Sequence, residues 1–307
     1  MLTILEASKS TDFAPVRGYV RAYAESHPIL RVLPMDIIGG NAKEFEIEGD
    51  LPEVEARGYN ENWNESTGRT DKRIETLMIA GGEIKVDTAI VEQGGDLRRA
   101  SEEARKLKSL GHWVGHRFIK GDSISSRKEI DGLQNRVPSS HLIPAGSTSG
   151  GDALSLALLD EAISGTISPN AILLNRQLIQ RISQAARNPS VGGYVQTIKD
   201  DFGRPLLTYN GLPLLEMNPV DSVYDTLSFS EANPGGGSAV GTSIYVVSFG
   251  DEGVHGIHNG MPKVKDFGEV PNGTYHLTRV EWRVGLASPG PHALTRIWGI
   301  KNAAFVA

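Results

Sequence analysis

The sequence contains no cysteine among its 307 residues. This absence excludes disulfide scaffolds, thiolate metal sites and a cysteine nucleophile, and it fits folding in a reducing cytoplasm. No apolar run reaches the roughly 18 residues that a transmembrane helix needs. Residues 1–10 also lack the basic start and apolar core of a signal peptide. We therefore expect no membrane partner.

An excess of basic residues is also missing. Lysine and arginine number 31 against 37 aspartates and glutamates, for a formal net charge of -6. Proteins that hold nucleic acid through its phosphates normally show a basic excess or a basic patch. If this protein lies beside nucleic acid, we expect it to enclose the nucleic acid without binding it specifically.

Complete catalytic motifs are absent as well. His112 and His116 are four residues apart, so on a helix they would share one face and could hold a metal ion. A zincin helix requires glutamate after the first histidine, and Trp113 stands there instead. Gly236–Gly241 has the spacing of a phosphate-binding loop, but Thr242 replaces the lysine. We therefore expect that the protein is not an enzyme and that it binds no metal and no cofactor. The alternative from a different functional class is a metal-dependent hydrolase that uses His112 and His116.

The chain is rich in turn-forming residues, with 35 glycines and 16 prolines, which indicates many short strands. Within residues 41–90, apolar residues alternate with charged ones on both sides of a polar tip at 58–68. This pattern predicts a long two-stranded ribbon with glycine breaks at Gly49 and at residues 81–82. At about 3.3 Å per residue, each arm would reach on the order of 50 Å.

Such a ribbon needs a surface to lie on, because a lone two-stranded hairpin is only marginally stable in water. Its outer positions carry charges of both signs, and no other segment of the chain offers an obvious surface on which it could pack. A hairpin packed on its own domain is the alternative interpretation. The preferred interpretation is a ribbon that contacts another molecule.

The rest of the chain mixes helices with strands, which predicts the α+β class. Helices are expected at 96–111, capped by Asp96 and ended by Gly111, then from the Asp152 cap to Ser164 and from the Asn175 cap to Arg187. A shorter helix is expected near residues 16–23. Residues 243–249 and 254–257 read as a hairpin, residues 280–286 as a half-buried strand with Trp282 inward, and residues 293–300 as the last strand.

Five local motifs follow one another in a characteristic order. They are residues 48–54 running into 57–61, residues 118–122 followed by 129–133, residues 172–176, residues 209–213 and residues 279–286. In this order, and together with the sequence of elements, they cover most of the chain. The chain thereby resembles the major capsid proteins of tailed bacteriophages, a lineage shared with herpesvirus shells and bacterial encapsulins.

The resemblance implies the phage major capsid fold and a division of the chain. Residues 1–40 would form an N-terminal arm and residues 41–90 the long β-hairpin called the E-loop. Residues 91–130 would form the peripheral P-domain with its spine helix, and residues 131–262 the axial A-domain. Residues 263–290 would return as a P-domain strand, and residues 291–307 would add a final strand to the A-domain.

The resemblance also implies a function. The chain would assemble with itself as pentamers and hexamers into an icosahedral shell that encloses phage DNA, and it would reside in the virion after assembly in the bacterial host cytoplasm. A portal is an expected partner, and so is a separate scaffolding protein, because the chain begins almost directly with the arm. An encapsulin-like compartment shell with an enzyme cargo is the nearest alternative. Neighbouring subunits would meet through the E-loop residues Arg57, Tyr59, Glu61, Trp63, Glu65, Arg69, Lys72 and Arg73.

Overall fold

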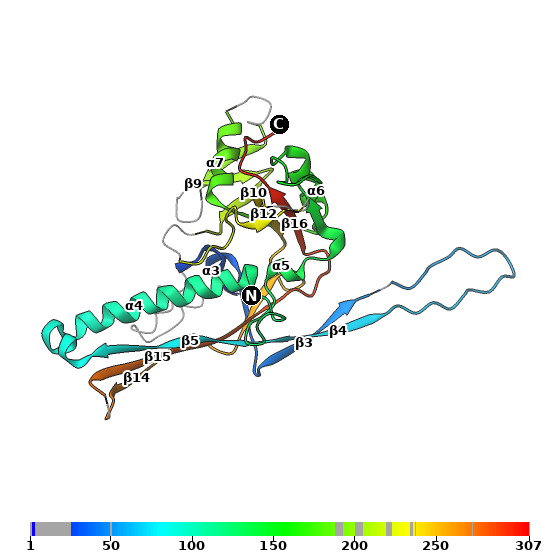
Figure 1. Ribbon diagram of the computed structural model, residues 1–307. Helices are drawn as coiled ribbons and strands as arrows, with labels where there is room; N and C mark the ends of the chain where they lie inside the picture. The colour runs from blue at the N-terminus through cyan, green and yellow to red at the C-terminus, as the bar shows by residue number, and fades with distance from the viewer. Residues whose placement is uncertain are drawn as a thin grey trace.

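The computed structural model describes residues 2–3, 26–49, 51–187, 193–199, 205–218, 223–233, 236, 238–271 and 273–306. The helix expected near residues 16–23 lies outside these residues. The described chain forms two separate sheets and a projecting hairpin (Figure 1). None of its described helices combines the length and apolar character needed to cross a membrane.

A six-stranded sheet forms one half of the body, with one long helix along one of its faces (Figure 1). Its strands are β1 (Leu2–Thr3), β2 (Pro34–Ile37), β5 (Met78–Asp87), β13 (His255–His258), β14 (Lys263–Glu269) and β15 (Tyr275–Ala287). The helix is α4 (Thr88–Lys120). Alternate residues of β15 are buried, including Val280, Trp282 and Val284, and they share a core with Leu107 of α4. The strand predicted at 280–286, with Trp282 inward, is therefore confirmed.

Helix α4 is much longer than the predicted helix at 96–111, so that prediction is wrong at both ends. The helix begins after Asp87, whose Oδ1 accepts a hydrogen bond from the Ala89 amide at 2.8 Å, and it ends before Gly121. It continues through Gly111 and Gly115. At Gly115 a Cβ atom would lie 2.3 Å from Cγ of His27, so this glycine makes room for a neighbouring ring and does not end the helix. Packing along a long sheet has outweighed the local stop signals.

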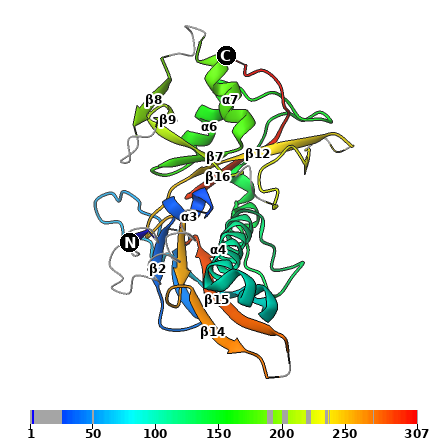
Figure 2. The ribbon, with the colours of Figure 1, turned by 90° about the vertical axis from the view of Figure 1, so that its left-hand side faces the viewer.

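An eight-stranded sheet forms the other half of the body (Figure 2). Its strands are β6 (Leu142–Pro144), β7 (Ala171–Leu174), β8 (Val195–Lys199), β9 (Pro205–Tyr209), β10 (Leu212–Glu216), β11 (Glu231–Ala232), β12 (Val240–Val247) and β16 (Leu294–Ile300). Helices α6 (Leu156–Ser164) and α7 (Arg176–Ala185) share a core with it. The cap of α7 at Asn175 is confirmed, but α6 is capped by Ser155 and not by Asp152. The last strand is confirmed as β16.

The hairpin predicted from residues 243–249 and 254–257 is wrong. Strand β12 pairs with β16 on one side and β7 on the other, so both of its edges are occupied. Strand β13 lies in the other sheet, between β2 and β15, and only an isolated bridge joins Phe249 to Val254. The chain thus returns to the six-stranded sheet at His255. The glycine-rich residues 250–253 do form a turn, but this turn connects two sheets and not two paired strands.

The described part of the expected arm belongs to the body. Helix α3 (Pro28–Val32) is capped by His27, and its residues Ile29 and Leu30 are buried in the same core as α4. Strand β2 follows and pairs with β13 in the six-stranded sheet. A second short helix, α5 (Leu133–Arg136), and the 3-10 turn η1 (Ser139–His141) carry the chain from α4 to β6.

Candidate assembly surfaces

The hairpin consists of β3 (Ala42–Glu48) and β4 (Thr70–Thr76), which pair only with each other and project away from the body (Figure 1). Every residue from 51 to 72 is exposed, so this part of the hairpin does not pack on the described part of its own chain, and the alternative of a packed hairpin holds only for its base. The pattern at residues 78–91, expected to continue the ribbon, belongs elsewhere: residues 78–87 form β5, and residues 88–91 begin α4. Strand β5 pairs with β15, because its buried side has α4 to pack against.

The end of the hairpin, here called the tip (residues 51–69), is folded into a defined turn. The Gly58 amide donates to Oε2 of Glu61 at 2.6 Å, and Nη1 of Arg57 donates to the Glu61 carbonyl at 2.8 Å. The Arg57 guanidinium lies over the ring of Trp63, 5.7 Å from its centroid. The tip therefore brings together three of the predicted contact residues and holds them in one arrangement.

The tip exposes apolar side chains inside an acidic surround. Exposed fractions reach 93% for Val54 and 60% for Trp63, and Tyr59 is fully exposed. Charged residues within the tip are the glutamates Glu53, Glu55, Glu61 and Glu65 and the arginines Arg57 and Arg69, for a net charge of -2. Exposed apolar groups rimmed by polar ones are typical of interaction sites.

The other predicted contact residues are engaged within the hairpin. Arg69 pairs with Asp71 at 2.8 Å, and Lys72 pairs with Glu44 at 2.7 Å, a hydrogen bond that raises the pKa of Lys72. Arg73 turns toward the base of the hairpin, where its Nε lies 2.9 Å from Oε1 of Glu75. The structure thus separates Arg57, Tyr59, Glu61, Trp63 and Glu65, near the end of the tip, from Arg69, Lys72 and Arg73, which form ion pairs within the hairpin.

A second surface, which sequence reasoning missed, lies on the side of the six-stranded sheet opposite α4. This outer face is defined by residues that alternate with the buried ones and are matched across β5, β15 and β14 by the strand register. Its charged members are Lys85, Lys263, Lys265, Arg279 and Arg283 against Glu83, Asp87 and Glu281, which gives a net charge of +2.

Aromatic and apolar groups lie among these charges. Phe267 is flanked by Nζ of Lys265, 4.8 Å from the ring centroid, and by the Arg279 guanidinium at 5.1 Å. Ile79 is 66% exposed on the same face. A depression of about 230 Å³ is lined by Lys263, Glu281, Arg283 and neighbouring residues. The outer face is therefore opposite in charge to the tip and offers apolar contacts of its own.

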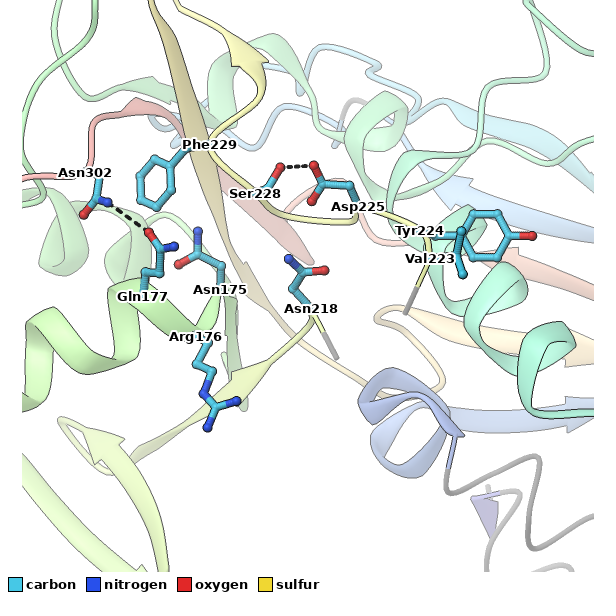
Figure 3. A pocket seen from close by; sticks show the side chains of 10 residues that line it. All are labelled: Asn175, Arg176, Gln177, Asn218, Val223, Tyr224, Asp225, Ser228, Phe229 and Asn302. Carbon is cyan, nitrogen blue, oxygen red and sulfur yellow. Dashed lines mark hydrogen bonds between the residues drawn. The ribbon is translucent and has the colours of Figure 1, made fainter. Parts of the chain in front are cut away.

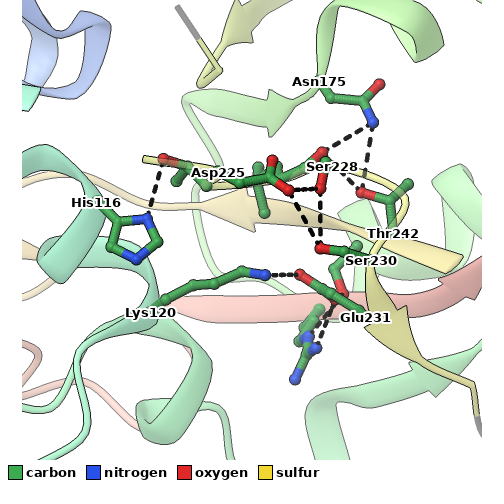
Figure 4. Close-up of polar contacts among 12 residues, drawn as sticks. His116, Lys120, Asn175, Asp225, Ser228, Ser230, Glu231 and Thr242 are labelled. Carbon is green, nitrogen blue, oxygen red and sulfur yellow. Dashed lines mark hydrogen bonds and ion pairs between the residues drawn. The ribbon is translucent and has the colours of Figure 1, made fainter. Parts of the chain in front are cut away.

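A charge network at the end of α4 ties this helix to the eight-stranded sheet (Figure 4). Nζ of Lys120 lies 3.0 Å from Oε1 of Glu231, and Nη2 of Arg296 lies 2.9 Å from Oε2 of the same carboxylate. Lys120 comes from the helix, Glu231 from β11 and Arg296 from β16. This shared carboxylate connects the helix to the eight-stranded sheet.

His112 and His116 both lie in the body of α4, on the side that faces α3 and the 224–226 segment. His112 is buried, with its ring centroid 6.4 Å from that of His27. Nδ1 of His116 lies 3.3 Å from the Thr226 hydroxyl, and burial, followed by Arg117 and Lys120, lowers the pKa of His116 to about 4. Among the residues that the structure describes, no group of three or more histidines or carboxylates is arranged around a metal position.

A depression of about 600 Å³ lies beside the N-terminal end of α7 (Figure 3). Its lining is dominated by amides and hydroxyls, including Asn175, Gln177 and Asn218, with the carboxylate of Asp225 on the opposite side. That carboxylate accepts a hydrogen bond from Ser228. The depression is open, with apolar side chains such as Phe229 and Val223 beside the polar ones, and neither His112 nor His116 lines it.

Comparison with solved structures decides the fold. A chain from the cryo-electron microscopy structure of the holo-SrpI encapsulin complex of Synechococcus elongatus superposes with a TM-score of 0.65 and 16% identity, over 91% of this chain and 89% of that one. The capsid of an empty GTA particle matches with a TM-score of 0.58 and 12% identity, over 92% and 90%. A chain from Mycobacterium phage Bobi matches with a TM-score of 0.58 and 14% identity, over 88% and 89%.

The chain has the shell fold of phage capsid proteins and encapsulins. At these identities the likeness establishes the fold alone. No protein-family model matches the sequence, and no curated protein matches it significantly. The α+β class and the shell fold expected from the sequence are confirmed.

Proposed function

We propose that this chain is the major capsid protein of a tailed phage, and that its copies assemble as pentamers and hexamers into an icosahedral shell around DNA. In this proposal the hairpin is the E-loop, the six-stranded sheet with α4 is the P-domain, and the eight-stranded sheet is the A-domain. Its role is structural, in the virion, with a portal and a separate scaffolding protein as partners. The observation that supports assembly most directly is the tip, which exposes apolar side chains that no described residue of the body covers.

The proposed contact places the tip of one subunit on the outer face of the next. The tip has a net charge of -2 and the outer face a net charge of +2, so each attracts the other and repels its own kind. Exposed ion pairs contribute only about 0–1 kcal/mol each, so they set orientation more than affinity. Trp63 and Tyr59 would supply the apolar anchors against Phe267 and Ile79. Many such weak contacts acting together close a shell.

A charge-exchange experiment tests the contact. Glu53→Lys with Glu55→Lys reverses the net charge of the tip, and Lys263→Glu with Lys265→Glu reverses the charge on part of the outer face. Each pair alone should prevent shells visible by negative-stain electron microscopy, most strongly at low salt where charges are least screened. Combining the two pairs should restore shells. Asp251→Lys with Glu252→Lys, on an exposed loop elsewhere, makes an equal change of charge and should leave assembly intact.

Two outcomes would count against the proposal. If the wild-type chain forms no closed shells under any assembly condition, the capsid function fails. If both single-surface variants assemble like the wild type, the tip does not dock on the outer face even if the chain forms shells.

An encapsulin-like compartment shell is the second candidate, favoured by the TM-score of 0.65 to the encapsulin chain against 0.58 to the GTA particle capsid. Both candidates share the same fold and self-association and differ in contents. Particles isolated from the source organism would hold nuclease-protected DNA if the chain is a phage capsid protein, and a protein cargo if it is an encapsulin.

A further inference from the structure

The base of the hairpin is attached to the body through one of its two faces. The register of β3 and β4 sets Lys43 opposite Glu75 and Phe45 opposite Arg73, so all four side chains lie on that face. Lys43 forms an ion pair with Asp36 of β2. The ring of Phe45 meets that of His255 of β13 edge-on, with centroids 5.4 Å apart. Beyond Phe45 and Arg73 the hairpin leaves the body.

Glu75 makes the most directional of these contacts. Its carboxylate accepts a hydrogen bond from each Nη atom of Arg136, one of them at 2.7 Å, so the pair is bidentate. Both residues are buried, at 7% and 8% exposed. Nε of Arg136 donates to the Asp131 carbonyl at 2.7 Å, which fixes the guanidinium plane relative to α5. Arg73 adds a third donor to the carboxylate from within the hairpin.

We propose that the Glu75–Arg136 pair sets the angle at which the hairpin leaves the body, and thereby the curvature of the shell; this inference rests on the proposed function. Tyr59 and Glu75 are 16 residues apart, so the lever between them is roughly 50 Å at about 3.3 Å per residue. A rotation of about 10° at the base would move the tip by about 9 Å, enough to miss its target on a neighbour.

The chemistry of the pair favours an orienting role over a stabilising one. Burying two charges costs nearly as much as their attraction returns, so such a pair is weak evidence for stability. The planar guanidinium group nevertheless donates two parallel hydrogen bonds to a carboxylate in only a narrow range of orientations. The other two anchors are less directional, because an ammonium group can be approached from many sides and an aromatic edge can slide over a ring.

The test replaces the charged pair with an apolar one. Glu75→Met with Arg136→Met fills a similar volume without leaving a buried charge alone, so the subunit should fold with an unfolding midpoint near that of the wild type. Asp152→Met with Lys301→Met is the matched control, because it removes an exposed ion pair beside β16 that does not touch the hairpin. Shell diameters are measured by electron microscopy. The wild type and the control should give one diameter, and the test variant should lose it and give mixed diameters or open sheets.

The hairpin angle can also be measured directly, because the chain has no cysteine. Thr70→Cys and Ser109→Cys place one spin label on the hairpin and one on α4, both at exposed positions. With labelled subunits diluted among unlabelled ones, the pulsed-EPR distance distribution should be narrow for the wild type and the control and broad for the test variant. If the test variant folds poorly, Arg136→Lys keeps the charge, loses the fork and should broaden the distribution to a lesser degree.

The inference is overturned if the test variant folds, gives the wild-type shell diameter and keeps a narrow distance distribution. A wild-type chain that forms no shells but shows the predicted broadening would overturn the proposed function and the link to curvature, while leaving the Glu75–Arg136 pair as the residue pair that fixes the hairpin. The two failures are therefore distinguishable.

Discussion

Replacing Gly115 with alanine should destabilise the protein, although helix propensity alone predicts the opposite. In an exposed helix interior, alanine is more favourable than glycine by about 0.8–1.0 kcal/mol. At Gly115, however, the new Cβ would lie 2.3 Å from Cγ and 2.5 Å from Nδ1 of the His27 ring. That ring is wholly buried, and its Nδ1 accepts the Ile29 amide at 3.3 Å, so it cannot move without uncapping α3. Overpacking of this kind typically costs about 1–3 kcal/mol, which exceeds the gain in propensity.

A double-mutant cycle measures this clash. Urea unfolding followed by circular dichroism is compared for the wild type, Gly115→Ala, His27→Ala and the double variant. Gly115→Ala should lower the midpoint in the wild type, but should be neutral or stabilising once His27→Ala has removed the ring. A single Gly115→Ala variant that is more stable than the wild type would refute the reasoning, because it would mean that α3 and α4 are not packed as described.

Three further predictions follow from the structure. Trp282 is 2% exposed, and its Nε1 donates to the Gly260 carbonyl at 2.9 Å. Trp282→Ala should therefore lower the free energy of unfolding by about 3–5 kcal/mol and give insoluble or strongly destabilised protein. Ile79→Ala, on the opposite face of the sheet, should be nearly neutral in the same urea titration. Replacing residues 54–65 by a short glycine-containing turn should leave the circular dichroism of the body unchanged but abolish shells in the microscope, since every replaced residue is exposed; normal shells would show that the tip is dispensable. Burial, followed by the nearby His112 and His116, lowers the pKa of His27 from 6.5 to about 3. Between pH 6.5 and about pH 3 the unfolded chain therefore binds more protons than the folded chain. The free energy of unfolding should fall by about 1.4 kcal/mol for each pH unit below 6.5. Urea midpoints between about pH 7 and about pH 4.5 should therefore fall less steeply in His27→Gln, and equal slopes would show that His27 is not the group responsible.

The sequence predicted those elements whose signals are local. Asn175 caps α7 where expected, because the cap is a contact between Asn175 Oδ1 and the Leu178 amide only three residues away. The inward position of Trp282 was also readable, since alternation along one strand is enough to define its buried side. The exposed tip was found because its polar and aromatic residues follow no buried pattern.

Signals that depend on a distant partner were misread. The alternation in β5 looks like a continuation of that in β4, yet β5 pairs with β15 almost 200 residues later in the chain, with Ile84 opposite Thr278. Gly115 reads as a helix weakener until the ring of His27 is placed against it. The Glu75–Arg136 pair joins residues 61 positions apart, and nothing in either neighbourhood marks them as partners.

The same distinction explains why one half of the proposed contact was visible in the sequence and the other was not. The tip is a single continuous segment, so its charges and aromatic residues can be summed directly. The outer face is built from three strands, and its net charge of +2 appears only when the register brings Lys263 beside Glu281 and Lys265 beside Arg279. The register of β14 itself shifts between Asp266 and Gly268, where Gly268 adopts a φ of 72°. Because such bulges turn side chains from one face of a sheet to the other, the surface that a neighbour meets is decided by strand register as much as by composition.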